Sequence, residues 1–137
     1  MEITLEVLDM TTAIRFKVTW SEPKKFENGN FNIDVDGIYL IGYRDIQTGK
    51  RYVVYVGQGD VGTRLTEHHR KNACVKRRIG QAGGIGYYRY ATCTTEDDRL
   101  AIELGLYHNH GGTALCNEVE PSGSGRYQKI EVEEIFS

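Results

Sequence analysis

The sequence predicts an α+β protein in which a small central three-stranded antiparallel β-sheet is flanked by helices. Segments 33–43, 51–56 and 87–94 are rich in β-branched and aromatic residues, which is typical of strands. Helical spacing and capping signals appear after residue 60 and again after residue 94. A length of 137 residues is enough for one domain, so we expect residues 1–137 to form a single unit.

Further strands are expected at both ends of the chain. Residues 3–8 and 14–20 alternate apolar and polar side chains, which predicts an extra N-terminal β-hairpin. Residues 21–32, which include Asn28-Gly29-Asn30, are expected to form a polar loop, and residues 130–136 a C-terminal edge strand. We therefore divide the domain into an N-terminal β extension (1–36), a core (37–117) and a C-terminal tail (118–137).

The central sheet should contain a hairpin. Thr48-Gly49 is a turn signal between segments 33–43 and 51–56, so these two are expected to pair as antiparallel strands. Residues 87–94 would add the third strand after a loose linker at Gly83-Gly84-x-Gly86.

Residues 53–70 are the most informative stretch, because they predict a strand, a glycine turn and a helix. Gly57-x-Gly59-x-x-Gly62 permits a turn that side chains do not obstruct, and Asp60 and Thr63 are candidate helix caps. The glycine spacing also matches the dinucleotide-binding fingerprint. That motif requires an acidic residue about 20 positions further on, and the chain has no carboxylate between Glu67 and Glu96. The nucleotide-binding interpretation is therefore disfavoured.

The helix after the glycines presents an anion-binding face. Arg64 and His68 lie one turn apart, and a guanidinium with a neighbouring imidazole suits a phosphate. Between Arg64 and Arg89, seven Lys or Arg residues stand against the single acid Glu67, a balance of +6. Residues 1–36 and 118–137 are each acidic by −3, so the basic charge is expected to form a local phosphate-binding face.

Thr95-x-x-Asp98 resembles a capping box and is expected to open the longest helix. Continuation of the helical spacing places Leu100, Leu104 and Tyr107 toward the core.

Glu103 is the anomaly in this helix. On a helical wheel it lies between Leu106 and Tyr107, inside the apolar arc, where an unpartnered carboxylate is unfavourable. The residues leave two explanations open: a buried ion pair with an arginine such as Arg64 or Arg99, or a metal ligand at the rim of a cleft.

Cys74, Cys93 and Cys116 are odd in number and contain no C-x-x-C pair. This pattern indicates neither a disulfide framework nor a zinc site, and is consistent with a reducing compartment. Neither a signal peptide nor an apolar stretch near 18 residues is evident, so we expect a cytoplasmic, intracellular protein that does not contact a membrane.

An ordered set of residues resembles the GIY-YIG endonuclease family. The resemblance covers about residues 37–117 and rests on Gly37-Ile38-Tyr39, Tyr55-Val56-Gly57, Arg64, His68, Glu103 and Asn117. It implies a GIY-YIG nuclease-like fold in which the two tripeptides lie on neighbouring strands. The chain departs from the family in a longer gap between the tripeptides, an Arg64 one residue closer to Tyr55, Val56 in place of Ile, and Gln58 where several members have lysine.

The resemblance also implies roles for these side chains. Tyr39 and Tyr55 would supply hydroxyls, one of them acting on the attacking water, while Arg64 would bind the scissile phosphate. His68 stands where the family has His or Tyr, Glu103 would be the ligand of one Mg²⁺ or Mn²⁺ per active site, and Asn117 would complete the site. Further substrate contacts are expected from Gly57, Gln58, Arg70, Lys76 and Arg77.

The expected function is therefore a divalent-metal-dependent endonuclease that hydrolyses phosphodiester bonds, most simply in DNA. The general base is left open between a tyrosine whose pKa is lowered by Arg64 or the metal, and His68. The main alternative is a nucleic-acid-binding module of the same fold with little or no cleavage, and a more distant one is a protein-interaction domain. Specificity would come from a homodimer, an accessory DNA-binding partner or the chain's own loops.

Overall fold

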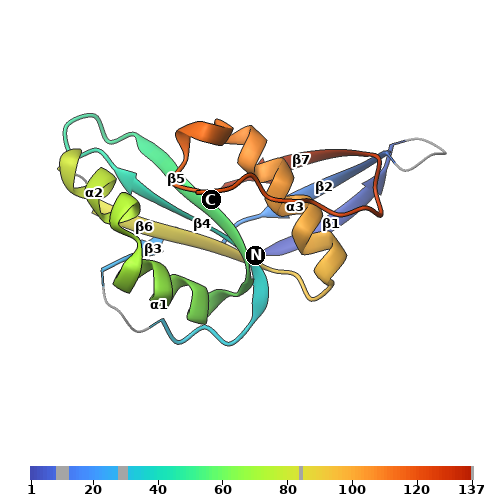
Figure 1. The fold of residues 1–137 in the computed structure, drawn as a ribbon, viewed down its shortest axis with the longest axis horizontal. Coiled ribbons are helices and arrows are strands. Elements are labelled where there is room, and N and C mark those ends of the chain that lie inside the picture. The colour runs from blue at the N-terminus through green and yellow to red at the C-terminus, as the bar shows by residue number, and fades with distance from the viewer. Residues whose placement is uncertain (9–12, 28–30, 84, 137) are drawn as a thin grey trace.

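Two β-sheets and a set of helices make up the part of the chain that the structure describes, and the class is α+β (Figure 1). The structure is a computed structural model that describes residues 1–8, 13–27, 31–83 and 85–136. The strands are β1 (Glu2–Val7), β2 (Ala13–Thr19), β3 (Lys24–Lys25), β4 (Asp36–Arg44), β5 (Arg51–Asp60), β6 (Ile85–Thr92) and β7 (Lys129–Ile135). The helices are α1 (Val61–Lys71), α2 (Ala73–Gln81), α3 (Glu96–Asn109) and a short 3-10 helix, η1 (Gly112–Ala114).

The central sheet is antiparallel throughout and has the strand order β3-β6-β4-β5. The predicted three-stranded sheet is therefore present as β6-β4-β5, but a fourth strand extends it. This strand is β3, which lies in the segment predicted as a polar loop and pairs with Tyr87 and Tyr88 of β6. The other part of that prediction, Asn28-Gly29-Asn30, lies outside the described residues.

The predicted hairpin between β4 and β5 is confirmed. The Asp45 carboxylate accepts hydrogen bonds from the backbone N–H groups of Gln47 (2.8 Å) and Thr48 (3.2 Å), and Gly49 has a φ of +74°. Asp45 is thus an Asx-turn residue, and only glycine adopts the left-handed conformation at position 49 without strain.

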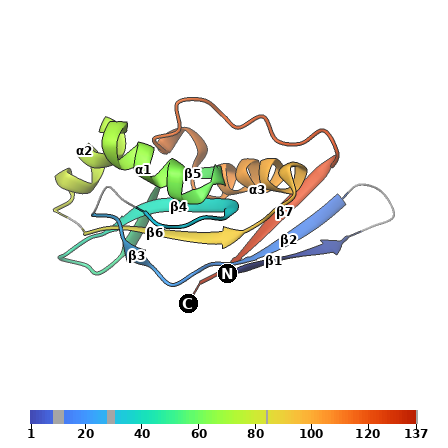
Figure 2. The same ribbon diagram turned by 90° about the horizontal axis from the view of Figure 1, so that it is seen from below.

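The second sheet joins the two ends of the chain. β1 and β2 pair antiparallel, as predicted, and β7 is an edge strand, as predicted, which pairs in parallel with β2. Figure 2 shows this sheet extending away from the four-stranded one.

The predicted glycine turn before α1 is wrong. Strand β5 continues through Gly57 and Gly59 to Asp60, and α1 begins directly after it. Asp60 is the N-cap as predicted, because its side chain accepts a hydrogen bond from the Thr63 N–H (3.0 Å). Gly62 is required by packing rather than by a turn, since a Cβ there would collide with the backbone of Phe31 and Ile33, in the segment before β4.

Helix α2 is a separate helix rather than a continuation of α1. Asn72 ends α1 and caps α2, where its side-chain oxygen accepts from the Val75 N–H (3.1 Å). The helix continues through Gly80 and ends at Gln81. Gly86 belongs to β6 and not to a linker, and Gly84 lies outside the described residues.

Helix α3 differs from its prediction in two respects. Thr95 is the N-cap residue, but its side chain makes no capping hydrogen bond, so the predicted capping box does not form. The buried residues are Ala101, Ile102, Leu106 and Tyr107, whereas the predicted core residues Leu100 and Leu104 are only half-buried. The apolar face is rotated because the helix packs on two sides: a Cβ at Gly105 would meet the Val132 side chain of β7.

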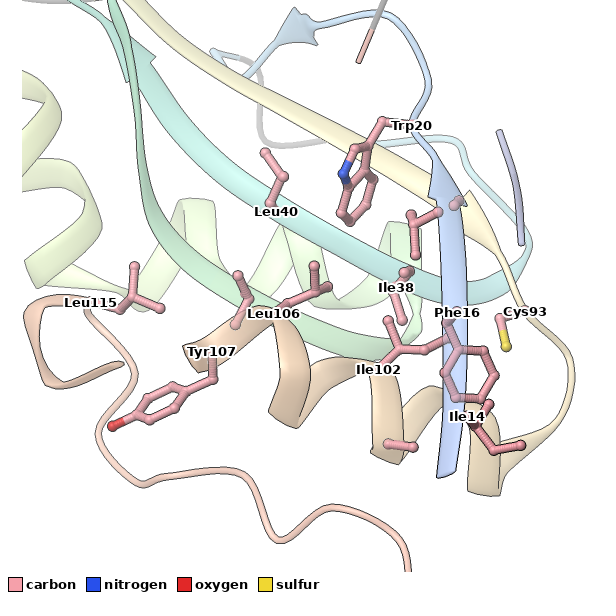
Figure 3. Packing of buried hydrophobic residues seen from close by; sticks show 14 of the residues in the cluster. Ile14, Phe16, Trp20, Ile38, Leu40, Cys93, Ile102, Leu106, Tyr107 and Leu115 are labelled. Carbon is pink, nitrogen blue, oxygen red and sulfur yellow. The ribbon is translucent and has the colours of Figure 1, made fainter. Parts of the chain in front are cut away.

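Two hydrophobic clusters lie on opposite faces of the four-stranded sheet, and β4 contributes to both because its side chains point alternately to the two faces. Ile38 and Leu40 join the cluster that packs against β2 and α3 (Figure 3). Tyr39 and Ile41 join the other cluster, beneath α1 and α2. Tyr39 is thereby directed toward the helix that carries His68.

A disulfide joins Cys74 at the start of α2 to Cys116 after η1, and it overturns the expectation that no cysteines are bridged. Cys93 is free and buried. A cross-link between residues 42 positions apart depends on tertiary structure, which spacing alone does not reveal. It also weakens the ground for expecting a reducing compartment. None of the described helices is both long and apolar enough to cross a membrane.

Candidate active site

Two tyrosines and a histidine form the centre of the site. Tyr39 on β4 is 1% exposed, and its hydroxyl lies 2.8 Å from His68 Nε2 on α1. The rings of Tyr39 and Tyr55 stack with centroids 6.2 Å apart, and the Tyr55 and His68 centroids are 4.1 Å apart. The pairing of β4 with β5 and the packing of α1 on that sheet face thus bring together residues far apart in the sequence.

The direction of these hydrogen bonds follows from Asn72. Its side-chain oxygen accepts from the Val75 N–H, so its NH₂ group faces His68 Nδ1 at 3.0 Å and must donate to it. Nδ1 of His68 is then the acceptor, and the proton of the neutral imidazole resides on Nε2. Nε2–H donates to the Tyr39 oxygen, which leaves the Tyr39 hydroxyl proton for another acceptor.

All three rings are neutral at pH 7. Burial raises the pKa of Tyr39 well above its ordinary value. Burial and the Glu103 carboxylate raise the pKa of Tyr55, while Arg64 and the Tyr39 hydroxyl, as a donor toward Tyr55, act in the opposite direction. Burial and the charge of Arg64 lower the pKa of His68 to about 4.

Glu103 is half-buried on α3 beside this cluster. Burial raises the pKa of its carboxyl to about 7, and Arg64 opposes that shift. Neither of the ion pairs considered from the sequence is present: Arg64 pairs with Glu67 (3.6 Å) and Arg99 donates to Gln58 (3.2 Å). Within the part of the chain that the structure describes, Glu103 forms no hydrogen bond or ion pair.

These observations identify Glu103 as the residue that could hold a divalent cation. An uncompensated, half-buried carboxylate gains from a nearby positive charge. No group of three or more His, Cys, Asp or Glu side chains in the described residues is placed to hold a metal. Mg²⁺ retains several waters and often has only one or two protein carboxylates, so this donor set fits such an ion.

The side chain of Asn117 makes two hydrogen bonds with the backbone of the edge strand β5. Its Nδ2 donates to the Val56 carbonyl (2.9 Å) and its Oδ1 accepts from the Val56 N–H (3.2 Å). The neighbouring Cys116 N–H donates to the Val54 carbonyl (2.6 Å). The side-chain amide of Asn117 is therefore engaged with the strand next to Tyr55, and it supports the site without facing substrate.

The residues predicted to contact substrate are dispersed. Gln58 pairs with Ile38 in the sheet and its side chain is held by Arg99, on the face opposite Tyr39. The predicted substrate contacts on α1 and α2 are exposed, and the Lys76 ammonium donates to the Arg70 carbonyl (3.4 Å); these residues are Arg70, Lys76 and Arg77.

Asn72 contacts His68 but was not among the residues predicted for the site. The signal available was an asparagine between two basic helical stretches, which is typical of an N-cap. Asn72 also lines a cleft of about 390 Å³ with His68, Glu118 and the disulfide.

Gly57 is fixed by Tyr39, since a Cβ at position 57 would overlap the Tyr39 hydroxyl and the ring carbon that bears it. We expect Gly57→Ala to push the ring aside, break its hydrogen bond with His68 and lower the free energy of unfolding by about 1–3 kcal/mol. Any cleavage activity should fall with it. Thermal unfolding and the tyrosine near-ultraviolet circular dichroism would measure these effects.

The matched control for this substitution is Gly80→Ala. Gly80 lies in helix α2 with nothing near the added Cβ, so alanine should leave stability unchanged or raise it slightly. Equal stability of the two alanine variants would show that Tyr39 does not require the space at Gly57.

No protein-family model, curated protein or solved structure matches the chain.

Proposed function

We propose that the chain is a GIY-YIG-type endonuclease that hydrolyses phosphodiester bonds in DNA with the help of one Mg²⁺ or Mn²⁺ ion. The observation that carries the proposal is the convergence of Tyr39, Tyr55, Arg64, His68 and Glu103, which come from β4, β5, α1 and α3. Two aromatic hydroxyls, an arginine and an unpaired carboxylate are what a phosphodiesterase needs to orient water and neutralise charge.

The tyrosines have different roles in this proposal. Tyr55 is half-buried, whereas Tyr39 is almost wholly buried, so Tyr55 is the hydroxyl that touches the substrate or the attacking water. Tyr39 is a positioning residue: it accepts from His68, and its ring stacks on that of Tyr55 with centroids 6.2 Å apart, which holds Tyr55 in place. His68 acts through Tyr39, because both of its nitrogens are engaged and its pKa of about 4 makes it a weak base.

Arg64 and Glu103 complete the site. The Arg64 guanidinium is about half exposed (51%) and can exchange its ion pair with Glu67 for a phosphate oxygen. Glu103, with a pKa of about 7, is ionised in about half of the molecules at neutral pH and is the residue that would hold the cation. The bound ion would supply charge neutralisation and activation of water.

Cleavage of supercoiled plasmid with Mg²⁺ or Mn²⁺ tests the proposal. We expect nicked or linear DNA, and loss of this product with EDTA and with Glu103→Ala. The matched control is Glu96→Ala on the same helix, where the side chain is exposed in the first turn and should not matter. Intact plasmid under all metal conditions would argue against the nuclease.

The alternative is a nucleic-acid-binding module with little or no cleavage. The raised pKa values of both tyrosines and the lowered pKa of His68 favour this alternative. Of these three side chains and Glu103, only Glu103 is partly ionised at neutral pH, so the site has few groups that could take a proton from the attacking water. Salt-dependent DNA binding in a gel shift without cleavage would identify this case.

A further inference from the structure

A cavity of about 550 Å³ lies on the sheet face opposite Tyr39, and the proposed cleavage makes no use of it. Tyr87, which lines it, belongs to the cluster on the α3 side of the sheet, and Val53, which also lines it, packs against that cluster. Phe136, after β7, is a further lining residue. The four-stranded sheet therefore separates this cavity from the Tyr39 and His68 pair.

Three arginines from three different elements line the cavity: Arg51 of β5, Arg78 of α2 and Arg89 of β6. None of the lining residues that the structure describes is acidic. Arg89 is 3% exposed and donates to the Ser21 carbonyl (3.2 Å). Burial is the main cause that lowers the pKa of Arg89, and the nearby charge of Arg51 lowers it further.

Arg51 and Arg78 supply the positive charge that an anion would meet. Neither forms an ion pair with a carboxylate among the described residues, and Arg78 donates to the Ala114 carbonyl. Clustered positive charge beside a cavity is unfavourable on its own and is compensated by a bound anion. The basic segment is thus divided between the two faces of the sheet instead of forming the single face that was predicted.

The cavity also offers flat surfaces suited to a nucleobase. The Arg51 guanidinium lies over the Tyr87 ring at 5.8 Å, and the Arg89 guanidinium lies over the Phe136 ring at 5.0 Å. Aromatic rings and guanidinium planes are the surfaces on which proteins stack unpaired bases. Burial raises the pKa of the Tyr87 hydroxyl, which therefore remains a neutral hydrogen-bond donor at pH 7.

We propose that this cavity binds a nucleoside 5′-phosphate, with the phosphate on Arg51 and Arg78 and the base against Tyr87 and Phe136. The volume is within the range of about 300–1,000 Å³ that is typical of small-ligand sites. The ligand is either a free nucleotide or the 5′-phosphorylated end of a strand, which present the same chemistry. The inference does not depend on the proposed cleavage, because the two sites share no residue.

Isothermal titration of the full chain with AMP, in EDTA to prevent cleavage, tests the proposal. We expect saturable binding, and a dissociation constant raised about tenfold by Arg51→Gln and about tenfold by Arg78→Gln, since each removes a charge-assisted hydrogen bond. Lys50→Gln, beside Arg51 but outside the cavity, and Glu103→Gln should bind AMP as the unchanged protein does. Thermal unfolding would show that each variant is folded.

Further arms of the titration identify the ligand. Adenosine and inorganic phosphate should each bind at least about tenfold more weakly than AMP if base and phosphate both contribute. Decathymidylate should also be titrated with a 5′-phosphate and with a 5′-hydroxyl. If only the 5′-phosphorylated strand binds more tightly than AMP, the ligand is the end of a strand. If AMP binds more tightly than both strands, the ligand is the free nucleotide. The proposal would be overturned if the unchanged protein did not bind AMP, or if Arg51→Gln and Arg78→Gln bound AMP as tightly as the unchanged protein does.

Discussion

Glu103→Gln should make the protein more stable above pH 7 while it abolishes cleavage. Burial raises the pKa of Glu103 from 4.5 to about 7, so the folded state favours the protonated carboxyl. The stability that this proton contributes is complete below pH 4.5 and is lost as the pH rises through 7. Glutamine stays neutral, and above pH 8 it should raise the free energy of unfolding by about 1–3 kcal/mol, allowing for partial exposure of the site.

Thermal unfolding of the two proteins at pH 5 and pH 8.5 would measure this difference. The melting temperatures should be close at pH 5 and diverge at pH 8.5, and Glu96→Gln on the exposed side of α3 should show no divergence. Mg²⁺ at millimolar concentration should stabilise the unchanged protein at pH 8.5 and leave Glu103→Gln unaffected. A variant that is less stable than the unchanged protein at both pH values would show that Glu103 has a compensating partner.

Removal of the disulfide is expected to lower the free energy of unfolding by about 4 kcal/mol. Cys74 and Cys116 are 42 positions apart in the sequence, and a cross-link over that separation greatly restricts the unfolded chain. The double variant Cys74→Ala/Cys116→Ala and the reduced protein should show the same loss in urea denaturation. Cleavage should fall as well, because Cys116 adjoins Asn117, which holds β5 next to Tyr55.

Cys93→Ala is the control for the disulfide. Cys93 is buried and free, so its loss should have a much smaller effect and should not depend on reductant. Equal stability of the protein with and without reductant would show that the cross-link does not form in solution.

Local signals in the sequence were sufficient where a single short-range interaction decides the structure. Thr48-Gly49 predicted the hairpin, and the Asp45 and Gly49 geometry explains why. Asp60 was correctly identified as a helix cap, since the interaction that defines it is only three residues long. The predicted turn at Gly57 was wrong because this glycine leaves space for Tyr39 of the neighbouring strand, and a contact between strands cannot be seen in the local spacing of residues.

Features that depend on distant segments were the ones that the sequence did not reveal. The pairing of Cys74 with Cys116 and the second apolar side of α3 against Val132 both require tertiary structure. The sequence named the candidate site residues from Tyr39 to Glu103 as a set, and their role stays a prediction; the differing exposure of Tyr39 and Tyr55 could not be read from it. The interaction of Asn72 with His68 was also missed, because the capping role of asparagine gives no indication of what its other side-chain atom contacts.

The parallel pairing of β2 with β7 constrains the order in which the chain can fold. Ala13 pairs with Lys129 and Thr19 with Ile135, so the second sheet cannot be completed until residue 135 has left the ribosome. The hairpin β4–β5 and helices α1 and α2 have no such requirement, because their partners are close in sequence. During synthesis, Phe16 and Val18 must therefore remain without the β7 strand beside them while the more than 100 residues up to Ile135 are made, and in this interval the nascent chain is exposed to aggregation.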